Sequence, residues 1–116
     1  QHHVRSIRQV ADNHDLIFYS AIDEGLVLTL AEPQDMAVHL ETALAGLHTP
    51  ERPAEIIACD CVLRRMEAED KQMSGRISDL LRQYRVRGFS TYGEQLNAMH
   101  VNQTMTGVAL YPPVRR

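Results

Sequence analysis

The sequence predicts an α+β domain with a mixed β-sheet of about five to six strands and two main helices packed mostly on one face. Three observations predict it. Short apolar segments separated by turn signals open the chain, and stretches with helical periodicity follow. The second half contains a strand, a helix and a strand in that order, which predicts a β-α-β unit with parallel strands.

Length and composition limit the classes of protein to which the chain can belong. Its 116 residues are enough for one core, and 44% hydrophobic with 23% charged residues is typical of a globular domain. No apolar run approaches the ~18 residues of a membrane span. The net charge of -3 and the aromatic content of 5% argue against a nucleic-acid-binding domain. We therefore expect a domain that contacts neither nucleic acid nor membrane.

The two ends indicate a fragment, because the chain begins with Gln1 and ends in a stiff, polar proline-containing segment. No signal peptide opens it. Cys59 and Cys61 lie too far apart along a predicted strand for an unstrained disulfide, and free thiols are typical of the cytosol, so we expect a cytoplasmic location. The predicted divisions are an N-terminal strand or fragment edge at 1–13, the main domain at 14–111 and an exit linker at 112–116.

Turn signals divide the N-terminal region into three predicted strands. Residues 4–10 indicate a weak first strand, Leu16–Tyr19 a second and Leu26–Leu30 a third. The turn-forming segments 12–15 and 23–25 separate them. Two turns between three short strands predict an antiparallel meander.

Helical periodicity begins after this region. Met36, Leu40, Leu44 and Leu47 are spaced four, four and three residues apart, which places them on one face of a helix. Asp35 precedes these residues, and a carboxylate is stabilised at the positively polarised start of a helix. We therefore expect a helix that packs on the sheet through these apolar residues.

The centre of the chain predicts the β-α-β unit. The apolar run Glu55–Cys59 is typical of a strand buried on both faces. The stretch from Cys61 to Tyr84 carries a helical apolar stripe, which indicates core packing or, alternatively, a dimer interface. Ser74 and Gly75 could bend or break this helix. The segment 87–93, flanked by glycines, predicts the second strand of the unit.

The C-terminal part predicts a loop and a final strand. Residues 94–103 are typical of a loop, with a short helical turn at Gln95–Met99. Thr104–Tyr111 predicts the last strand, in which Gly107 marks a bulge or a close backbone approach.

The tripeptide Cys59–Asp60–Cys61 is the first candidate site, because it lies where a buried strand leads into a helix. Unpaired backbone N–H groups and the helix dipole favour anions at such a point. Asp60 would cap the helix by accepting those N–H bonds. The same field, together with Arg64, would favour a reactive thiolate at Cys61. A capped helix with inert buried thiols is the alternative.

Glu94 is the second candidate. It follows Tyr92 at a strand end, on a segment that also carries His100, Asn102 and Gln103. A carboxylate beside these groups suits recognition of a polar, cationic or amphoteric small molecule. The alternative is a loop that is held by its own side-chain hydrogen bonds. Arg82, Arg85 and Arg87 are expected to form a solvated face.

The segment Gly88–Glu94, which reads GFSTYGE, and the downstream segment Asn102–Thr104 resemble the C-terminal half of a FIST (F-box and intracellular signal transduction) domain. Weaker similarities upstream extend the resemblance over 14–111. It implies an intracellular sensory module that binds a small ligand such as an amino acid, without catalytic activity, and that is joined to an N-terminal FIST half and a signalling output domain. The family's motif residues fall on Gly88, Phe89, Tyr92, Gly93, Glu94, Asn102, Gln103 and Thr104.

An amino acid carries both charges, so its carboxylate would favour the helix start with Arg64, and its ammonium group Asp60 or Glu94. If the two strands are neighbours, both groups lie at the carboxyl edge of one sheet, where crevices form. We expect no catalytic residue, cofactor or metal. The alternatives are a thiol-based redox sensor or enzyme using Cys61, and a non-catalytic module that forms a homodimer. The predicted ligand-binding residues are Asp60, Cys61, Arg64, Tyr92, Glu94, His100, Asn102 and Gln103.

Overall fold

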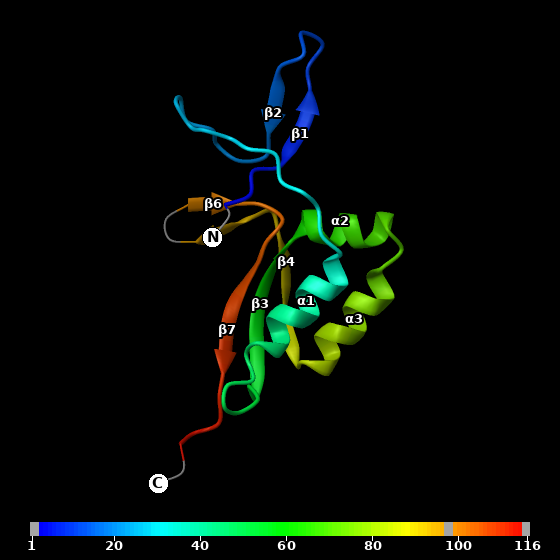
Figure 1. Cartoon of the computed structure of the whole chain (residues 1–116), viewed down its shortest axis with the longest axis vertical. Helices are drawn as coiled ribbons and strands as arrows, with labels where there is room; N and C mark the ends of the chain where they lie inside the picture. Colours follow the sequence, from blue (N-terminus) through cyan, green and yellow to red (C-terminus); the bar gives the residue numbers. More distant parts are fainter. Residues whose placement is uncertain (1–2, 97–98, 115–116) are drawn as a thin grey trace.

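The computed structural model of the chain describes residues 3–96 and 99–114. Within this described part the chain forms three helices and seven strands, which confirms the α+β class (Figure 1). The strands are divided among one sheet of three strands and two separate pairs. The helices lie against one face of the three-stranded sheet, as predicted.

The central sheet consists of β3 (Glu55–Cys61), β4 (Val86–Thr91) and β7 (Met105–Leu110), in the order β4-β3-β7. β3 is parallel to β4 and antiparallel to β7, so the predicted β-α-β unit is confirmed. Ile56 faces the helices and is 6% exposed, whereas Ile57 on the other face is 48% exposed. The prediction that β3 is buried on both faces is wrong, because the described helices cover only one of them.

The helix α1 (Met36–Ala45) forms where the periodicity predicted it. It begins at Asp35, whose side-chain oxygen accepts a hydrogen bond from the Val38 N–H at 2.9 Å. Met36, Leu40 and Leu44 are buried in the core. The predicted face of α1 is thus the face that packs on the sheet.

The second predicted helix is divided into α2 (Val62–Asp70) and α3 (Ser74–Gln83). The break lies at the predicted position, just before Ser74, and Gln72 takes a left-handed backbone conformation with φ 56°. Ile77, Leu80 and Tyr84 bury the apolar stripe of α3 in the core. This part of the stripe therefore serves core packing, whereas Met66 of α2 is 49% exposed.

The N-terminal region forms a hairpin that projects from the main body (Figure 1). β1 (Ile7–Val10) and β2 (Leu16–Phe18) pair in antiparallel fashion, as predicted. The prediction of a third strand at Leu26–Leu30, and hence of a meander, is wrong for this structure. These residues are irregular and exposed, since in the described part of the chain they have no neighbouring strand with which to pair.

A second hairpin replaces the predicted loop after β4. β5 (Glu94–Leu96) and β6 (Met99–Val101) pair in antiparallel fashion, so the helical turn expected at Gln95–Met99 is wrong for the residues that can be described; 97–98 lie outside them. The backbone N–H of Asn102 donates to the Val4 carbonyl at 3.2 Å. This bond ties the second hairpin to the N-terminal region.

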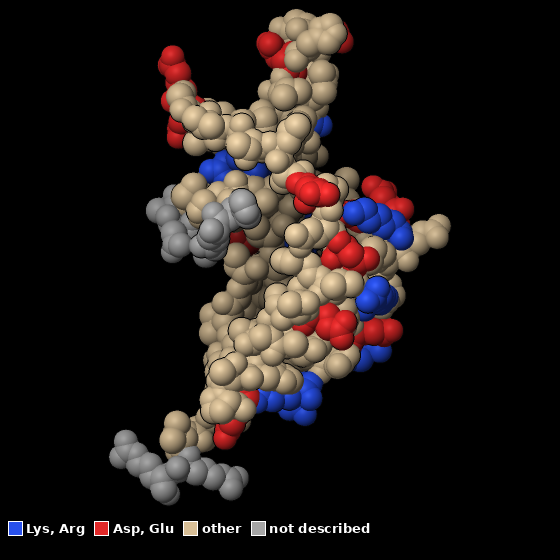
Figure 2. Space-filling model, in the orientation of Figure 1, with Lys and Arg blue, Asp and Glu red and all other residues tan. Residues whose placement is uncertain are grey.

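No helix in the part of the chain that is described has the length and apolarity to cross a membrane. Figure 2 shows basic and acidic side chains intermixed over the helices, and acidic side chains at the outer tips of the N-terminal region. The surface around the helices thus carries both signs of charge.

Candidate functional site

Asp60 and Arg64 form an ion pair at the carboxyl edge of the central sheet. Asp60 lies near the end of β3, opposite Ser90 of the parallel strand β4. α2 begins directly after β3, so Arg64, one turn into the helix, is turned back toward the strand end. Its Nε donates to Asp60 Oδ1 at 2.7 Å, and the two side chains are only 13% and 24% exposed.

This pairing corrects the prediction that Asp60 caps the helix. The residue at the N-cap position is Cys61, and the structure shows no side-chain capping bond there among the described residues. The carboxylate of Asp60 is engaged by Arg64 instead, because the i,i+4 spacing brings the guanidinium within reach across the strand–helix junction.

A cavity of about 370 Å³ opens beside the ion pair. It lies between the sheet edge and the two helices of the β-α-β unit. Apolar side chains such as Ile77 and Leu81 line one part of it, and the hydroxyl-bearing Ser90 lies on the strand side. The volume falls within the range of small-molecule pockets, which combine apolar walls with a few polar groups.

Burial raises the pKa of Asp60 above its ordinary value of 3.8. The positive charge of Arg64 and its hydrogen bond act in the opposite direction, and the negative charge of Glu94 adds to the rise. The influence of Glu94 shows that the two carboxylates lie within electrostatic range. A partly desolvated carboxylate interacts more strongly with a cation than one in water does.

Glu94 is buried, with 6% of its surface exposed, and joins two strands. Its carboxylate accepts a hydrogen bond from the hydroxyl of Thr91, at the end of β4, at 2.6 Å. It accepts another from the hydroxyl of Thr104, just before β7. Glu94 therefore stabilises the sheet edge from inside, at a place where its side chain is closed off from solvent.

Two other predicted site residues are completely buried. Cys61 is 0% exposed, and its N–H donates to the Thr104 carbonyl at 3.0 Å. Asn102 is also 0% exposed, and neither amide atom of its side chain has a hydrogen-bond partner among the described residues. Gly93, beside Asn102, has φ 138°, and a Cβ there would collide with the His100 ring and lie 2.9 Å from the Val101 carbonyl oxygen, so glycine is needed at this position.

Like Glu94, Cys61 and Asn102, the remaining predicted residues are not part of the cavity lining. Tyr92 is 88% exposed, and His100 is partly buried on β6. Gln103 is exposed and accepts a hydrogen bond from the Ser6 hydroxyl at 3.1 Å. Of the predicted site residues, Asp60 and Arg64 line the cavity. Glu94 lies outside the lining and influences Asp60 through its charge.

Sequence reasoning missed Ser90 as a cavity residue. The signal was present in the period of two along β4, because Ser90 shares the helix-facing side with Gly88 and pairs with Asp60.

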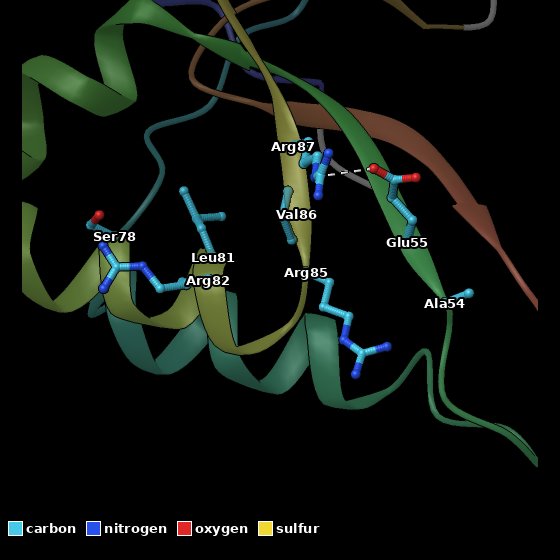
Figure 3. A pocket seen from close by; sticks show the side chains of 8 residues that line it. All are labelled: Ala54, Glu55, Ser78, Leu81, Arg82, Arg85, Val86 and Arg87. Carbon is cyan, nitrogen blue, oxygen red and sulfur yellow. Dashed lines mark ion pairs between the residues drawn. The ribbon is translucent and has the colours of Figure 1, made fainter.

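A larger cavity of about 790 Å³ lies at the other end of the sheet (Figure 3). Arg82, Arg85 and Arg87 line it, but their side chains extend in different directions. Arg87 points toward Glu55, and its Nε lies 3.2 Å from Glu55 Oε1. Because the guanidinium groups do not converge on one point, this cavity is a weaker candidate than the one beside Asp60.

Fold and site together define a small α+β domain with a mostly buried charge pair at the carboxyl edge of its sheet. The family model described as the FIST C domain matches residues 1–97, so the chain belongs to the FIST C family. This is a family of signal-transduction sensory domains, and the resemblance seen in the sequence is confirmed. No curated protein and no solved structure gave a match.

Proposed function

We propose that the cavity beside Asp60 and Arg64 binds a small molecule that carries both a carboxylate and an ammonium group, such as an amino acid. Binding would be passed to an output domain joined to this sensory domain. The observation that supports the proposal is a charge pair of opposite sign, mostly buried, on the wall of a cavity of about 370 Å³.

The two charged groups have donor and acceptor capacity left for a ligand. Arg64 uses Nε toward Asp60, and the described residues show no hydrogen bond from its two Nη groups. Guanidinium groups bind carboxylates through two parallel N–H bonds, so the ligand carboxylate is assigned to Arg64. Asp60 accepts through Oδ1, which leaves Oδ2 for the ligand ammonium.

The apolar walls and Ser90 would select among such molecules. Ile77 and Leu81 offer a surface for an aliphatic side chain. The other charged residues of the lining, Arg65 and Glu69, are exposed and paired with each other, so a second charge on the ligand would be desolvated against the apolar part. Ser90 can donate to or accept from a polar atom of the ligand. We therefore propose a neutral amino acid with a small or medium apolar side chain. In this proposal Glu94 does not contact the ligand; its negative charge acts on Asp60 and raises the pKa of that carboxyl.

Isothermal titration calorimetry of the chain against each standard amino acid tests the proposal. Arg64→Gln should weaken binding by about 10- to 100-fold, because a hydrogen bond to a charged group is worth about 1.5–3 kcal/mol. Arg76→Gln is the matched control, since Arg76 is an exposed arginine on α3 that does not line the cavity. Absence of binding by every amino acid, or equal loss in both variants, would refute the site.

The two alternative functions have less support. A thiol-based sensor or enzyme needs a reagent to reach Cys61, whose exposure is 0%. A dimer built on the second helical stretch needs a continuous exposed apolar stripe, but Ile77, Leu80 and Tyr84 are in the core, and Met66 is the large apolar residue of the stripe that is exposed in the described part of the chain.

A further inference from the structure

A groove of about 530 Å³ follows the outer edge of the central sheet, between α1 and β7. Its floor and walls are mostly apolar and include Leu40, Leu44 and Ile56 from the core together with residues 105–109 of β7. In the described part of the chain β7 has β3 as its single neighbour, and Figure 1 shows no strand on its outer side. The backbone groups along that edge are therefore open to pairing with an added strand.

The same chain carries an apolar segment that lacks a strand partner. Leu26–Leu30, which we call the arm, reads LVLTL, and all of it is exposed, with Val27 at 86% and Leu30 at 101%. In the described part of the chain its backbone makes one hydrogen bond, from Leu26 N–H to the Asp23 carbonyl. Its composition is that of a strand, and its environment in the protomer is water.

Arm and groove match in length, side-chain pattern and charge. The arm has five residues and β7 has six. In a strand, Leu26, Leu28 and Leu30 share one face, which would enter the groove, while Val27 and Thr29 point outward. The arm is flanked by Asp23, Glu24 and Glu32, and among the described residues the groove lining contains no acidic side chain that would repel them; its charged or titratable residues are His39 and Arg64, whose Nε is paired with Asp60. Figure 2 shows acidic side chains at the tips of the N-terminal region.

We infer that two copies of this chain exchange arms, each arm adding a strand to β7 of the other copy and filling its groove. The arm lies outside its own groove in the structure, so the groove is free to receive the arm of a second copy. The radius of gyration is 16.4 Å, against about 13 Å for a compact domain of this length, which fits a protomer whose arm extends outward. Reciprocal exchange closes the pair with two-fold symmetry and leaves neither arm exposed.

Sedimentation equilibrium of the whole chain tests the exchange. The wild-type chain should be a dimer at micromolar concentration. Leu28→Asp places a charge inside the groove and should raise the dimer dissociation constant at least about 100-fold. Thr29→Asp is the matched control, with the same charge on the outward face, and should leave the dimer intact. A monomeric wild type, including one whose arm folds into its own groove, or equal loss in both variants, would overturn the inference.

A mixing experiment separates arm exchange from other modes of dimerisation. Ala43→Glu changes an exposed position of α1 that lines the groove, so this variant keeps a good arm but has a blocked groove. It should be monomeric alone, as should Leu28→Asp, and circular dichroism should show that both retain their helices. An equimolar mixture should form a heterodimer, because one intact arm then meets one intact groove. A mixture that stays monomeric would contradict the exchange.

Discussion

Glu94 offers the sharpest test of how the sheet edge is held together. Its buried carboxylate accepts hydrogen bonds from Thr91 and Thr104, and thus joins the end of β4 to the start of β7. We expect Glu94→Ala to lower the free energy of unfolding by about 3 kcal/mol. Two hydrogen bonds to a charged group are each worth about 1.5–3 kcal/mol, and the desolvation cost of the carboxylate, which is removed with it, offsets part of the sum.

The assay is urea denaturation followed by circular dichroism. With a slope of about 1.5 kcal/mol/M, a loss of 3 kcal/mol moves the midpoint by about 2 M. Glu41→Ala, at an exposed position of α1, is the control and should change the free energy of unfolding by less than about 0.5 kcal/mol.

A double-mutant cycle on the two threonines completes the test. Thr91→Val and Thr104→Val should each cost about 1.5 kcal/mol, and the pair should cost at least as much as Glu94→Ala, since it leaves a buried carboxylate without donors. If Glu94→Ala loses less than about 1 kcal/mol, the carboxylate does not hold the two strands together and the reasoning is refuted.

Three further predictions follow from burial, backbone geometry and charge. Gly88→Ala should prevent folding or cost more than about 3 kcal/mol, because its Cβ would collide with the Ala58 carbonyl oxygen. Gly75→Ala, with open space around it in α3, should stabilise the chain by about 0.5–1 kcal/mol in thermal melts. Leu40→Ala should cost about 2–5 kcal/mol in urea, against less than about 1 for the exposed Val38→Ala. Because burial raises the pKa of Asp60, the folded state binds the proton of this carboxyl more tightly than the unfolded state does. Above the folded pKa the ionised carboxylate therefore lowers the free energy of unfolding. This loss disappears as the pH falls below 3.8, where the group is protonated in both states. A ¹³C carboxyl titration by NMR should show the midpoint above 3.8, and a midpoint at or below it would contradict the burial argument.

The sequence was most informative where one local signal was sufficient. Met36, Leu40 and Leu44 define a helical face in any context, and they form the buried face of α1. The strand–helix–strand order determined the parallel pairing of β3 and β4, because the crossover leaves little topological choice. The position of the helix break before Ser74 was also readable from the chain.

The secondary-structure and burial predictions were wrong where residues distant in the sequence determine the local structure. Leu26–Leu30 has the composition of a strand, but a strand exists only if another strand pairs with it, and composition cannot supply one. The apolar run of β3 indicated burial on both faces, whereas the number of layers around a sheet is a property of the whole fold. Residues 94–103 suggested a loop, while cross-strand pairing between Gln95 and His100 makes a hairpin.

The candidate site was predictable in part. The parallel pairing of β3 with β4 puts the strand ends that precede α2 and Glu94 at one edge of the sheet, as the strand–helix–strand order predicts. The side-chain roles were less accessible. Asp60 could either cap the helix or form an i,i+4 ion pair with Arg64, and the geometry of the strand–helix junction shows that it forms the ion pair. The two hydroxyl groups that bind Glu94 come from separate strands, so no local pattern reveals them.

The most direct test of the central claim, that the Asp60–Arg64 pair receives an amphoteric small molecule, is an NMR titration of the Arg64 side chain. The ¹⁵N-labelled chain is titrated with those amino acids that bind in calorimetry, and the Nε–Hε resonances of the arginines are followed. The account predicts a saturable shift of the Arg64 resonance, with the resonance of Arg76 unchanged. A ligand that binds while the Arg64 resonance stays in place would show that the site lies elsewhere.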